Sequence, residues 1–380
     1  MMVCKLSSKS NIKEIFSKLG VTPEGSAIMA QKVTMNLLYI KGIKTPAANI
    51  LKQDALSVGA DLAVPKETVT CKVSEVDALL IATNQQLKAL IKKEMLQPFG
   101  LKALAQELRA VMLTCKDDFS VMGVINANED SFYKQSRFLG AVALEKIESM
   151  IQMGANIIDL GGVSSRPGSL AVSEEEELSR IKPIIDLIKK HELYSKADFS
   201  LDSYSPLCVK YALQSGFKII NDIMALQNDA VAELVAKYDA TVVLMHMQGD
   251  PERMQEKPTY DNVLFEVDTF FKERIAKAKG FGISKIILDV GIGFGKTLEH
   301  NLQLLKHHAH FLHFGYPLLV GASRKSLINT ITPSLSKERL PGTLALHLKA
   351  YENGASILRV HDVKEHVQAL SVLRAIQQTI

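Results

Sequence analysis

The chain has 380 residues, a length that suggests two domains rather than one. Hydrophobic residues make up 47% of it and charged residues 23%, which is ordinary for a globular protein with a sizeable core. The formal net charge of +4 is too small to indicate a nucleic-acid-binding protein, and no apolar run reaches the roughly 20 residues of a membrane helix. We therefore expect neither a nucleic-acid nor a membrane partner, whereas a small anionic substrate is compatible with the charge.

The four cysteines are scattered and include no pair spaced as Cys-x-x-Cys. This scatter is typical of reduced thiols rather than of a disulfide framework or a metal site. Residues 1–13 contain lysines without the apolar segment of a secretory signal. These features together predict a cytoplasmic protein.

Residues 1–115 do not follow the rhythm of the rest of the chain. Helices are expected at residues 11–19, 47–58, 84–93 and 101–112, and a strand at residues 78–82. This region contains no catalytic motif and no internal repeat. We interpret it as a small α/β domain, or extension, of unknown role that precedes a second domain of residues 116–380.

From residue 118 onward, a short β-branched run, a polar loop and an amphipathic segment recur eight times. The expected strands are residues 119–126, 156–161, 198–202, 218–222, 240–246, 285–290, 317–321 and 356–360. Eight strands that alternate with helices over roughly 260 residues are what a (β/α)8 TIM barrel requires. The predicted fold class is therefore α/β, a TIM barrel preceded by a small α/β domain.

Each predicted strand ends in a polar or charged residue. These residues are Asn126, Asp159, Asp202, Asn221-Asp222, His246, Asp289, Ser323-Arg324-Lys325, and Arg359 with His361. TIM barrels place their active site at the C-terminal ends of the strands, so the set as a whole predicts an active site. Single members have other interpretations: Asp202 could cap a helix, Asn221-Asp222 could form a turn, and His246 could be a hydrogen-bonded core histidine.

Two loops have the composition of ligand-binding segments. The first, residues 161–168, is rich in glycine and hydroxyl groups and contains Arg166. The second, residues 291–297, looks like a P-loop but lacks its spacing, so nucleotide binding is rejected and Phe294 is expected to pack against a flat ligand. Residues 323–326 precede a short helix, which together with Lys325 suits a carboxylate or phosphate. His307, His308 and His310 lie far from the strand ends, and we reject them as a metal cluster.

Ten segments in this order resemble those of the dihydropteroate synthase family, and the resemblance covers residues 120–372. They are residues 122–126, 130–132, 158–162, 165–168, 220–223, 244–249, 288–289, 293–296, 319–326 and 359–362. The family is a set of pterin-binding TIM-barrel transferases of folate biosynthesis. The resemblance implies that 7,8-dihydropterin-6-ylmethyl diphosphate condenses with p-aminobenzoate to give 7,8-dihydropteroate and pyrophosphate, an alkyl-group transfer of class EC 2.5.1. It also implies that the protein is a sulfonamide target.

The resemblance assigns residues to three pockets. Catalytic roles fall to Asp202, Lys325 and Asn126, and the pterin pocket consists of Asp202, Asn221, Asp289 and Lys325. The diphosphate pocket consists of Asn126, Arg359 and His361, with Asn126 as the protein ligand of a Mg²⁺ cofactor. The p-aminobenzoate pocket consists of Ser165, Arg166, Pro167, Phe294 and Ser326, and Asp130 and Phe132 belong to a lid loop.

The chain departs from the family pattern in its first loop, where the usual Thr-Pro and Gly-Gly pairs are missing from residues 127–136. Val163 stands where the family has Glu, and Val290 where it has Pro. We expect altered kinetics rather than loss of activity. Two alternatives stay open, a pterin-dependent methyltransferase domain and a non-catalytic pterin-binding homologue. Family members are usually homodimers, and we expect one here.

Overall fold

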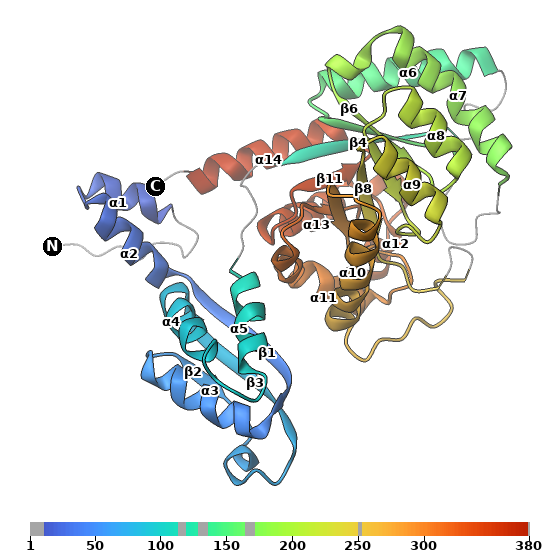
Figure 1. The fold of residues 1–380 in the computed structure, drawn as a ribbon. Helices are drawn as coiled ribbons and strands as arrows, with labels where there is room; N and C mark the ends of the chain where they lie inside the picture. Colours follow the sequence, from blue (N-terminus) through green and yellow to red (C-terminus); the bar gives the residue numbers. More distant parts are fainter. Residues whose placement is uncertain (1–10, 113–118, 128–135, 164–171, 250–252, 379–380) are drawn as a thin grey trace. The chain divides into compact units, whose positions relative to one another are not determined.

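The computed structural model describes residues 11–112, 119–127, 136–163, 172–249 and 253–378. The chain divides into two compact units, Met1–Thr114 with Val372–Ile380, and Cys115–Ser371. Each unit is built around its own hydrophobic cluster. Figure 1 shows residues 11–112 of the first unit in blue and cyan, its C-terminal residues in red, and the second unit from teal to red.

Residues 11–112 of the N-terminal unit form a three-stranded antiparallel sheet and five α-helices, and the unit also includes the last residues of α14 (Val363–Gln378). Its elements are α1 (Ile12–Lys18), α2 (Pro23–Val33), β1 (Met35–Lys44), α3 (Thr45–Ser57), β2 (Asp61–Ala63), β3 (Glu75–Thr83), α4 (Asn84–Glu94) and α5 (Leu101–Ala110). Strand β3 lies between β1 and β2. Buried Leu80 of β3, Leu51 of α3, Leu87 of α4 and Leu101 of α5 belong to one cluster, so these three helices pack on one face of the sheet.

The predicted helices of this unit are found with ends shifted by two residues or fewer, and the predicted strand is the middle of β3. Helix α2 and strands β1 and β2 were not predicted. Residues 37–40 of β1 are all apolar, which hides the alternation by which a half-buried strand is recognised.

The second unit is a closed barrel of eight parallel strands, as predicted. Its strands are β4 (Ser120–Asn126), β5 (Ile157–Gly161), β6 (Asp198–Asp202), β7 (Ile219–Asp222), β8 (Thr241–Met245), β9 (Ile286–Asp289), β10 (Leu318–Val320) and β11 (Ile357–Val360). Neighbouring strands pair in chain order, and β11 closes the barrel against β4. Every observed strand lies within its predicted range.

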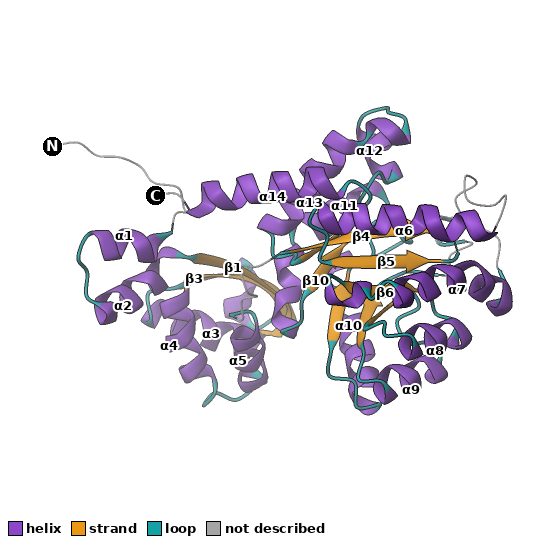
Figure 2. Ribbon diagram, turned by 90° about the horizontal axis from the view of Figure 1, so that it is seen from above, coloured by secondary structure: helices purple, strands orange, loops and turns teal. Residues whose placement is uncertain are grey.

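Helices surround this barrel (Figure 2). They are α6 (Ser136–Gln152), α7 (Glu174–Lys190), α8 (Pro206–Gln214), α9 (Asp229–Lys237), α10 (Val263–Gly280), α11 (Leu298–Lys306), α12 (Ser326–Ile331), α13 (Leu340–Glu352) and α14 (Val363–Gln378). Caps fix two of the helix starts. The Ser173 hydroxyl accepts from the Glu176 N–H (3.2 Å), and the Ser205 hydroxyl accepts from the Cys208 N–H (3.3 Å) before the first-turn Pro206.

The barrel strands are buried on both faces, as in parallel sheets covered by helices. Their outward side chains, such as Ile158, Leu244 and Leu358, pack against the helices. Their inward side chains form a separate apolar layer that fills the barrel. This layer consists of Met122, Ile157, Ile219, Val243, Ile287, Leu319 and Ile357. The barrel is therefore a packed core rather than a pore, and its layer supports the residues at the strand ends.

Candidate active site

The inward-facing side chains change from apolar to charged toward the C-terminal ends of the strands. Because successive side chains alternate between the two faces, a residue two positions beyond the apolar layer faces inward as well. Four of the seven positions reached in this way are polar: Asp159 after Ile157, Asn221 after Ile219, Asp289 after Ile287 and Arg359 after Ile357. The other three are Val124, Met245 and Gly321. The barrel thus places a polar layer directly above an apolar one.

Strand register brings two further predicted residues into this layer. Asn126 pairs with Gly161, Gly161 with Asp202, and Asp202 with Asn221, so the four stand in one row across β4 to β7. A Cβ atom on Gly161 would lie 3.8 Å from Oδ1 of Asn126 and 3.8 Å from Oδ2 of Asp202. Glycine at this position therefore leaves an amide oxygen and a carboxylate oxygen facing a shared space.

Arg359 links the row to Asp159. Its Nε donates to Oδ2 of Asp159 (2.6 Å), and its second guanidinium nitrogen donates to Oδ2 of Asp202 (2.5 Å). Asn221 Nδ2 also donates to Oδ2 of Asp159 (3.2 Å). The planar guanidinium suits this task because its donors are held in a fixed fork. Sequence reasoning noted Asp159 only as a strand end and gave it no pocket, although its inward position two residues after Ile157 marks it.

The layer carries three carboxylates, those of Asp159, Asp202 and Asp289, against the cations of Arg359 and Lys325. Burial raises the pKa of Asp202 to about 7, with Arg359 opposing the rise and Asp159 adding to it. Burial also raises the pKa of Asp289, opposed by Lys325. Burial lowers the pKa of Lys325 to about 8, although the nearby charge of Asp289 opposes this decrease. Groups that titrate near neutrality within one small site are typical of binding and catalytic sites.

Lys325 and Phe294 meet at the edge of this layer. The Lys325 ammonium lies 4.4 Å from the centroid of the Phe294 ring and donates to the Ile292 carbonyl. Gly293, at φ +84°, permits the approach, since a Cβ there would lie 3.1 Å from Lys325 Cδ. Asp289 Oδ1 accepts from the Gly291 N–H (2.8 Å), which fixes the start of the same loop. A half-buried aromatic face and a cation are thus presented together.

Lys296 holds the loop of residues 291–296 in place. No role was predicted for this residue from the sequence. Its buried ammonium donates to the carbonyls of His246 (3.1 Å), Gly291 (3.0 Å) and Phe294 (2.8 Å). All three protons of an ammonium group are used in this way. The lysine that makes this segment look like a P-loop is therefore a scaffold residue, in agreement with the rejection of nucleotide binding.

The segment after β10 is anchored to the segment after β11. The Arg324 guanidinium donates to both carboxylate oxygens of Asp362 (3.0 and 2.5 Å), and the His361 Nδ1 lies 2.9 Å from the Ser323 hydroxyl. Burial and the neighbouring Arg359 lower the pKa of His361 to about 4, so its ring is neutral at pH 7. Ser326 is exposed and begins α12, one residue earlier than expected.

Two buried histidines fix the backbone beneath this segment. His347 Nε2 accepts from the Ala322 N–H (2.9 Å), and His347 Nδ1 lies 2.8 Å from His366 Nε2. The far nitrogen of His366 lies 2.6 Å from the Asp362 carbonyl oxygen. Because a carbonyl oxygen only accepts, Nδ1 of His366 carries a proton, and its Nε2 accepts from Nδ1 of His347. Each ring therefore holds one proton and is neutral. Residues 322–325 are thereby positioned without a charge beneath them.

The structure decides between the alternative interpretations of three strand ends. Asp202 does not cap α8, because Ser205 does. The Asp222 carboxylate accepts from the Met224 and Leu226 N–H groups (2.8 and 2.7 Å), so it is a turn residue, whereas Asn221 faces the site. His246 is buried against Phe270, with ring centroids 4.9 Å apart, and burial lowers its pKa to about 2, as suits a core histidine. The expected hydrogen bond is not found, because its buried Nδ1 has no partner among the described residues.

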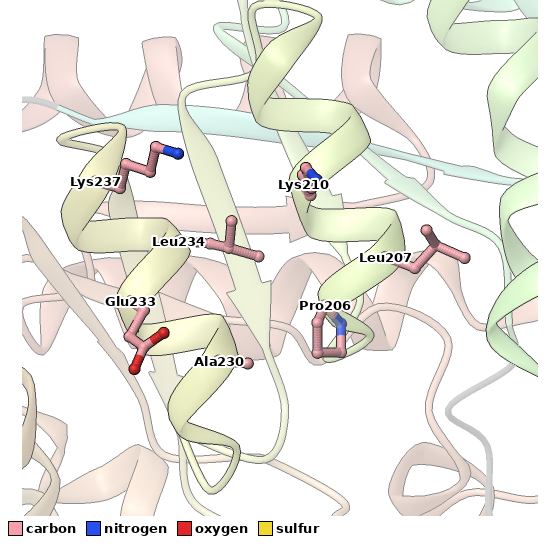
Figure 3. A pocket seen from close by; sticks show the side chains of 7 residues that line it. All are labelled: Pro206, Leu207, Lys210, Ala230, Glu233, Leu234 and Lys237. Atoms are coloured by element: carbon pink, nitrogen blue, oxygen red, sulfur yellow. The ribbon is translucent and has the colours of Figure 1, made fainter.

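Five predicted site residues, Ser165, Arg166, Pro167, Asp130 and Phe132, lie outside the residues that the structure describes. A separate pocket lies on the outer wall of the barrel between α8 and α9 (Figure 3). Its lining consists of Pro206, Leu207, Lys210, Ala230, Glu233, Leu234 and Lys237. It includes none of the strand-end residues, so we do not regard it as the active site.

A closed parallel barrel with a charged layer at its strand ends defines an enzyme of the TIM-barrel class, and known proteins identify its family. The model of pterin binding enzymes matches residues 122–361. The chain is 41% identical over 379 residues to the bifunctional dihydropteroate synthase/dihydropteroate reductase of Helicobacter pylori, with 100% of both chains covered. It is 44% identical over 259 residues to the dihydropteroate synthase of Escherichia coli K12, which covers 67% of this chain and 90% of that one.

Solved structures agree. The dihydropteroate synthase of Yersinia pestis, crystallised as a sulfonamide drug complex, matches with a TM-score of 0.65 and 37% identity over 70% of this chain and 98% of that one. The chain belongs to the pterin binding enzyme family and, within it, to the dihydropteroate synthases. The predicted family, fold and enzyme class are confirmed. None of the described helices is long and apolar enough to cross a membrane.

Proposed function

We propose that this barrel condenses 7,8-dihydropterin-6-ylmethyl diphosphate with p-aminobenzoate, and that its charged layer performs the reaction. The aniline nitrogen forms a bond to the pterin methylene carbon, the carbon–oxygen bond to the diphosphate breaks with its electron pair, and the nitrogen loses a proton. The observation that carries the proposal is the linked set of Asp159, Asp202 and Asn221, at the ends of the neighbouring strands β5 to β7, with Arg359 of β11.

The pterin is held by Asp202, Asn221, Asp289 and Lys325. The pterin edge offers ring N–H and amino donors beside a carbonyl acceptor. Carboxylates accept from the donors, an amide pairs with a mixed edge, and an ammonium donates to the carbonyl. Support comes from burial: Asn221 and Asp289 are 4% and 7% exposed, so contacts with them are made away from water, where polar contacts are stronger.

Asp202 has a second role in the displacement step. Positive charge develops on the pterin methylene as the diphosphate leaves, and a fixed carboxylate in a water-poor site stabilises such charge. The single positive charge of Arg359 neutralises only one of the two negative charges on the carboxylates that it contacts, Asp159 and Asp202. The set carries one net negative charge when both acids are ionised, which favours a cationic transition state.

The diphosphate would lie toward Asn126, Arg359 and His361, and Asn126 would hold a Mg²⁺ ion. Asn126 fits this ion, because its Oδ1 faces the side of Gly161 that carries no side chain, and Mg²⁺ prefers a few hard oxygen ligands beside waters and phosphates. Bound Mg²⁺ would neutralise charge on the leaving diphosphate. Arg359 lies alongside, and neutral His361 can donate a hydrogen bond.

The second substrate, p-aminobenzoate, lies on Phe294 with its carboxylate toward Ser326. The half-buried Phe294 ring beside the Lys325 ammonium offers an aromatic face and a positive charge to an aromatic anion. Ser165, Arg166 and Pro167 complete this pocket in our proposal. Sulfonamides, bound by the Yersinia pestis relative, would compete for the same place. We further propose a cytoplasmic homodimer without nucleic-acid or membrane partners.

The decisive experiment is an assay of pyrophosphate release by the purified chain with Mg²⁺. The proposal predicts release only when the pterin diphosphate and p-aminobenzoate are both present, with 7,8-dihydropteroate formed in equal amount. Release that is independent of p-aminobenzoate would contradict it. The same assay addresses the alternatives, because neither a methyltransferase nor a non-catalytic homologue forms dihydropteroate.

A second activity is favoured by one observation. The Helicobacter pylori relative, which is named as both synthase and reductase, matches the whole chain, whereas the Escherichia coli synthase matches 67% of it. We propose that this chain also reduces dihydropteroate, with a hydride going to the carbon–nitrogen double bond of the dihydropterin ring and a proton to its nitrogen. A reduced nicotinamide nucleotide would supply the hydride. Oxidation of that nucleotide only when dihydropteroate is added, with tetrahydropteroate as product, is expected; unchanged dihydropteroate would refute it.

A further inference from the structure

Three side chains on the outer wall of the barrel form a cluster that the synthase reaction does not use. Asp268 lies in α10, and His310 and His313 lie in the 3-10 helix η4 (His308–Phe314) that precedes β10. Oδ1 of Asp268 is 3.2 Å from Nε2 of His310 and 3.0 Å from Nε2 of His313. The histidines rejected from the sequence as a metal cluster were His307, His308 and His310. The fold instead joins His310 to His313 and to an acid from another helix.

The hydrogen bond on the far side of His313 defines what its inner nitrogen can do. Nδ1 of His313 lies 2.7 Å from the His310 carbonyl oxygen, which can only accept, so Nδ1 carries the proton. In the neutral ring, Nε2 then presents a lone pair to the Asp268 carboxylate oxygen. Two acceptors at this distance repel each other unless a proton or a metal cation lies between them, and Asp268 raises the pKa of His313, so the site favours a positive charge at this point. An N–H to carbonyl bond on the outer nitrogen is the usual arrangement of a metal-binding histidine.

The Asp268 oxygen is unsatisfied in the way that a ligand would be. Oδ1 of Asp268 and Nε2 of His310 are both buried, and among the described residues neither makes a hydrogen bond of good geometry, although the two atoms lie 3.2 Å apart. The other oxygen, Oδ2, contacts the Lys272 ammonium at 2.9 Å, which leaves Oδ1 for the two imidazoles. Buried polar atoms without partners are uncommon in proteins and suggest an ion or water that completes the site.

The two oxygen–nitrogen separations in this cluster are close to those between ligands of a tetrahedral ion. Zinc binds imidazole nitrogen and carboxylate oxygen at about 2.0–2.1 Å, so neighbouring ligand atoms lie about 3.3 Å apart around it. The two measured oxygen–nitrogen separations, 3.2 and 3.0 Å, are close to that value, and all three ligand atoms lie within 4.8 Å of one another. The side chain of His310 is 30% exposed, so water can supply a fourth ligand.

Local sequence explains why the two histidines face the same way. Residues three apart lie on one face of a 3-10 helix, and His310 and His313 have that spacing. The same turn packs against α10 through Phe311 and Phe271, with ring centroids 5.7 Å apart. The ligands are therefore held on two elements that are already in contact.

We propose that Asp268, His310 and His313 bind one divalent transition-metal ion of the zinc type, which ties α10 to η4 and leaves the synthase site untouched. Imidazole nitrogens with one carboxylate suit zinc and exclude magnesium and calcium, which prefer oxygen ligands. The ion would stabilise the outer wall of the barrel rather than take part in catalysis.

The test titrates Zn²⁺ into the metal-stripped full chain in competition with a chromophoric chelator. We expect one tight equivalent per chain, an affinity at least tenfold weaker in H310A, H313A and D268N, and no change in H307A, the matched control at the neighbouring histidine. Co²⁺ should give the visible absorption of a tetrahedral site in the wild type and not in H313A. Unchanged synthase activity in H310A would establish that the variant is folded.

The proposal is overturned if the wild type binds no more Zn²⁺ than the double variant H310A/H313A, or if H307A weakens binding as much as H313A. The first result would mean that Asp268 pairs with a protonated His313 instead. A zinc-dependent rise in the melting temperature of the wild type that is absent from the double variant would support the structural role of the ion.

Discussion

The barrel and the three-stranded sheet of the N-terminal unit use their strands in opposite ways. Barrel strands are buried on both faces, and their inner face ends in charged residues that pair with one another. Strand β3 of the sheet buries only small and apolar residues on its covered face, Ala78, Leu80 and Ala82. On β1, the alternate residues Leu37 and Tyr39 are 66% and 56% exposed.

This difference indicates which residues contribute mainly to stability and which contribute to function. Burying a charge costs free energy even when it is paired, so a paired charged layer is weak evidence for stability and good evidence for a ligand. The apolar core of the sheet needs no ligand to explain it. Substitutions in the barrel layer should therefore change the synthase rate, whereas substitutions in the sheet core should change the folding of the N-terminal unit and leave the synthase rate unchanged.

The largest effect is expected for Asp202→Ala. This change removes a pterin contact, the partner of Arg359 and the charge beside the developing cation. Loss of one preorganised electrostatic group costs about 10²- to 10³-fold in kcat. Steady-state kinetics with both substrates measure it, and Asp198→Ala, at the opposite and exposed end of β6, is the control. A kcat within threefold of the wild type would show that Asp202 is not part of the chemistry.

Lys296→Met should have the next largest effect. It leaves three carbonyls without their donor, at a cost of about 1–3 kcal/mol for each buried group that stays unpaired. We expect a lower melting temperature and, because Phe294 loses its support, a kcat lowered by about tenfold to a hundredfold. A variant that melts earlier but keeps the wild-type kcat would mean that this loop does not position a substrate.

The pH dependence should be smaller and bell-shaped. The synthase needs ionised Asp202, whose pKa is about 7, and protonated Lys325, whose pKa is about 8. kcat/KM should therefore rise as pH increases through the first value and fall through the second. Asp159 raises the pKa of Asp202, so Asp159→Asn should move the acidic limb to lower pH. An acidic limb at the same pH in this variant would mean that ionisation of Asp202 does not determine the pH profile.

Leu80→Ala should have the least effect on the reaction. Truncation of this fully buried side chain costs about 2–5 kcal/mol in the N-terminal unit. We expect earlier unfolding of that unit and a synthase kcat within twofold of the wild type. Ile287→Ala, in the apolar layer beneath Asp289, is the matched barrel substitution and should lower kcat. Equal losses of kcat in the two variants would remove the distinction between the units.

The barrel was predictable because its strands are short, apolar and regularly spaced. The polar strand ends were predictable too, since Asn126, Asp202 and Asp289 each follow such a run. The ion pair between Asp159 and Arg359 was not predictable, because the two residues are 200 apart in the sequence. Only closure of the barrel between β11 and β4 brings them together.

Two other features could not be predicted for different reasons. Lys296 looked like part of a phosphate loop, because a sequence does not show that its donors are already used by carbonyls. Strand β1 was missed because its exposed side is also apolar. In both places the local pattern has two structural solutions, and tertiary contacts decide between them.

The central claim is that the charged layer at the strand ends holds the pterin. The most direct test is calorimetric titration of the pterin diphosphate, with Mg²⁺, into wild type, Asp289→Asn and, as a control on the outer wall, Asp268→Asn. Loss of one charged hydrogen-bonding group predicts binding about tenfold to a hundredfold weaker for Asp289→Asn, and unchanged binding for Asp268→Asn. Wild-type affinity in Asp289→Asn would contradict the account.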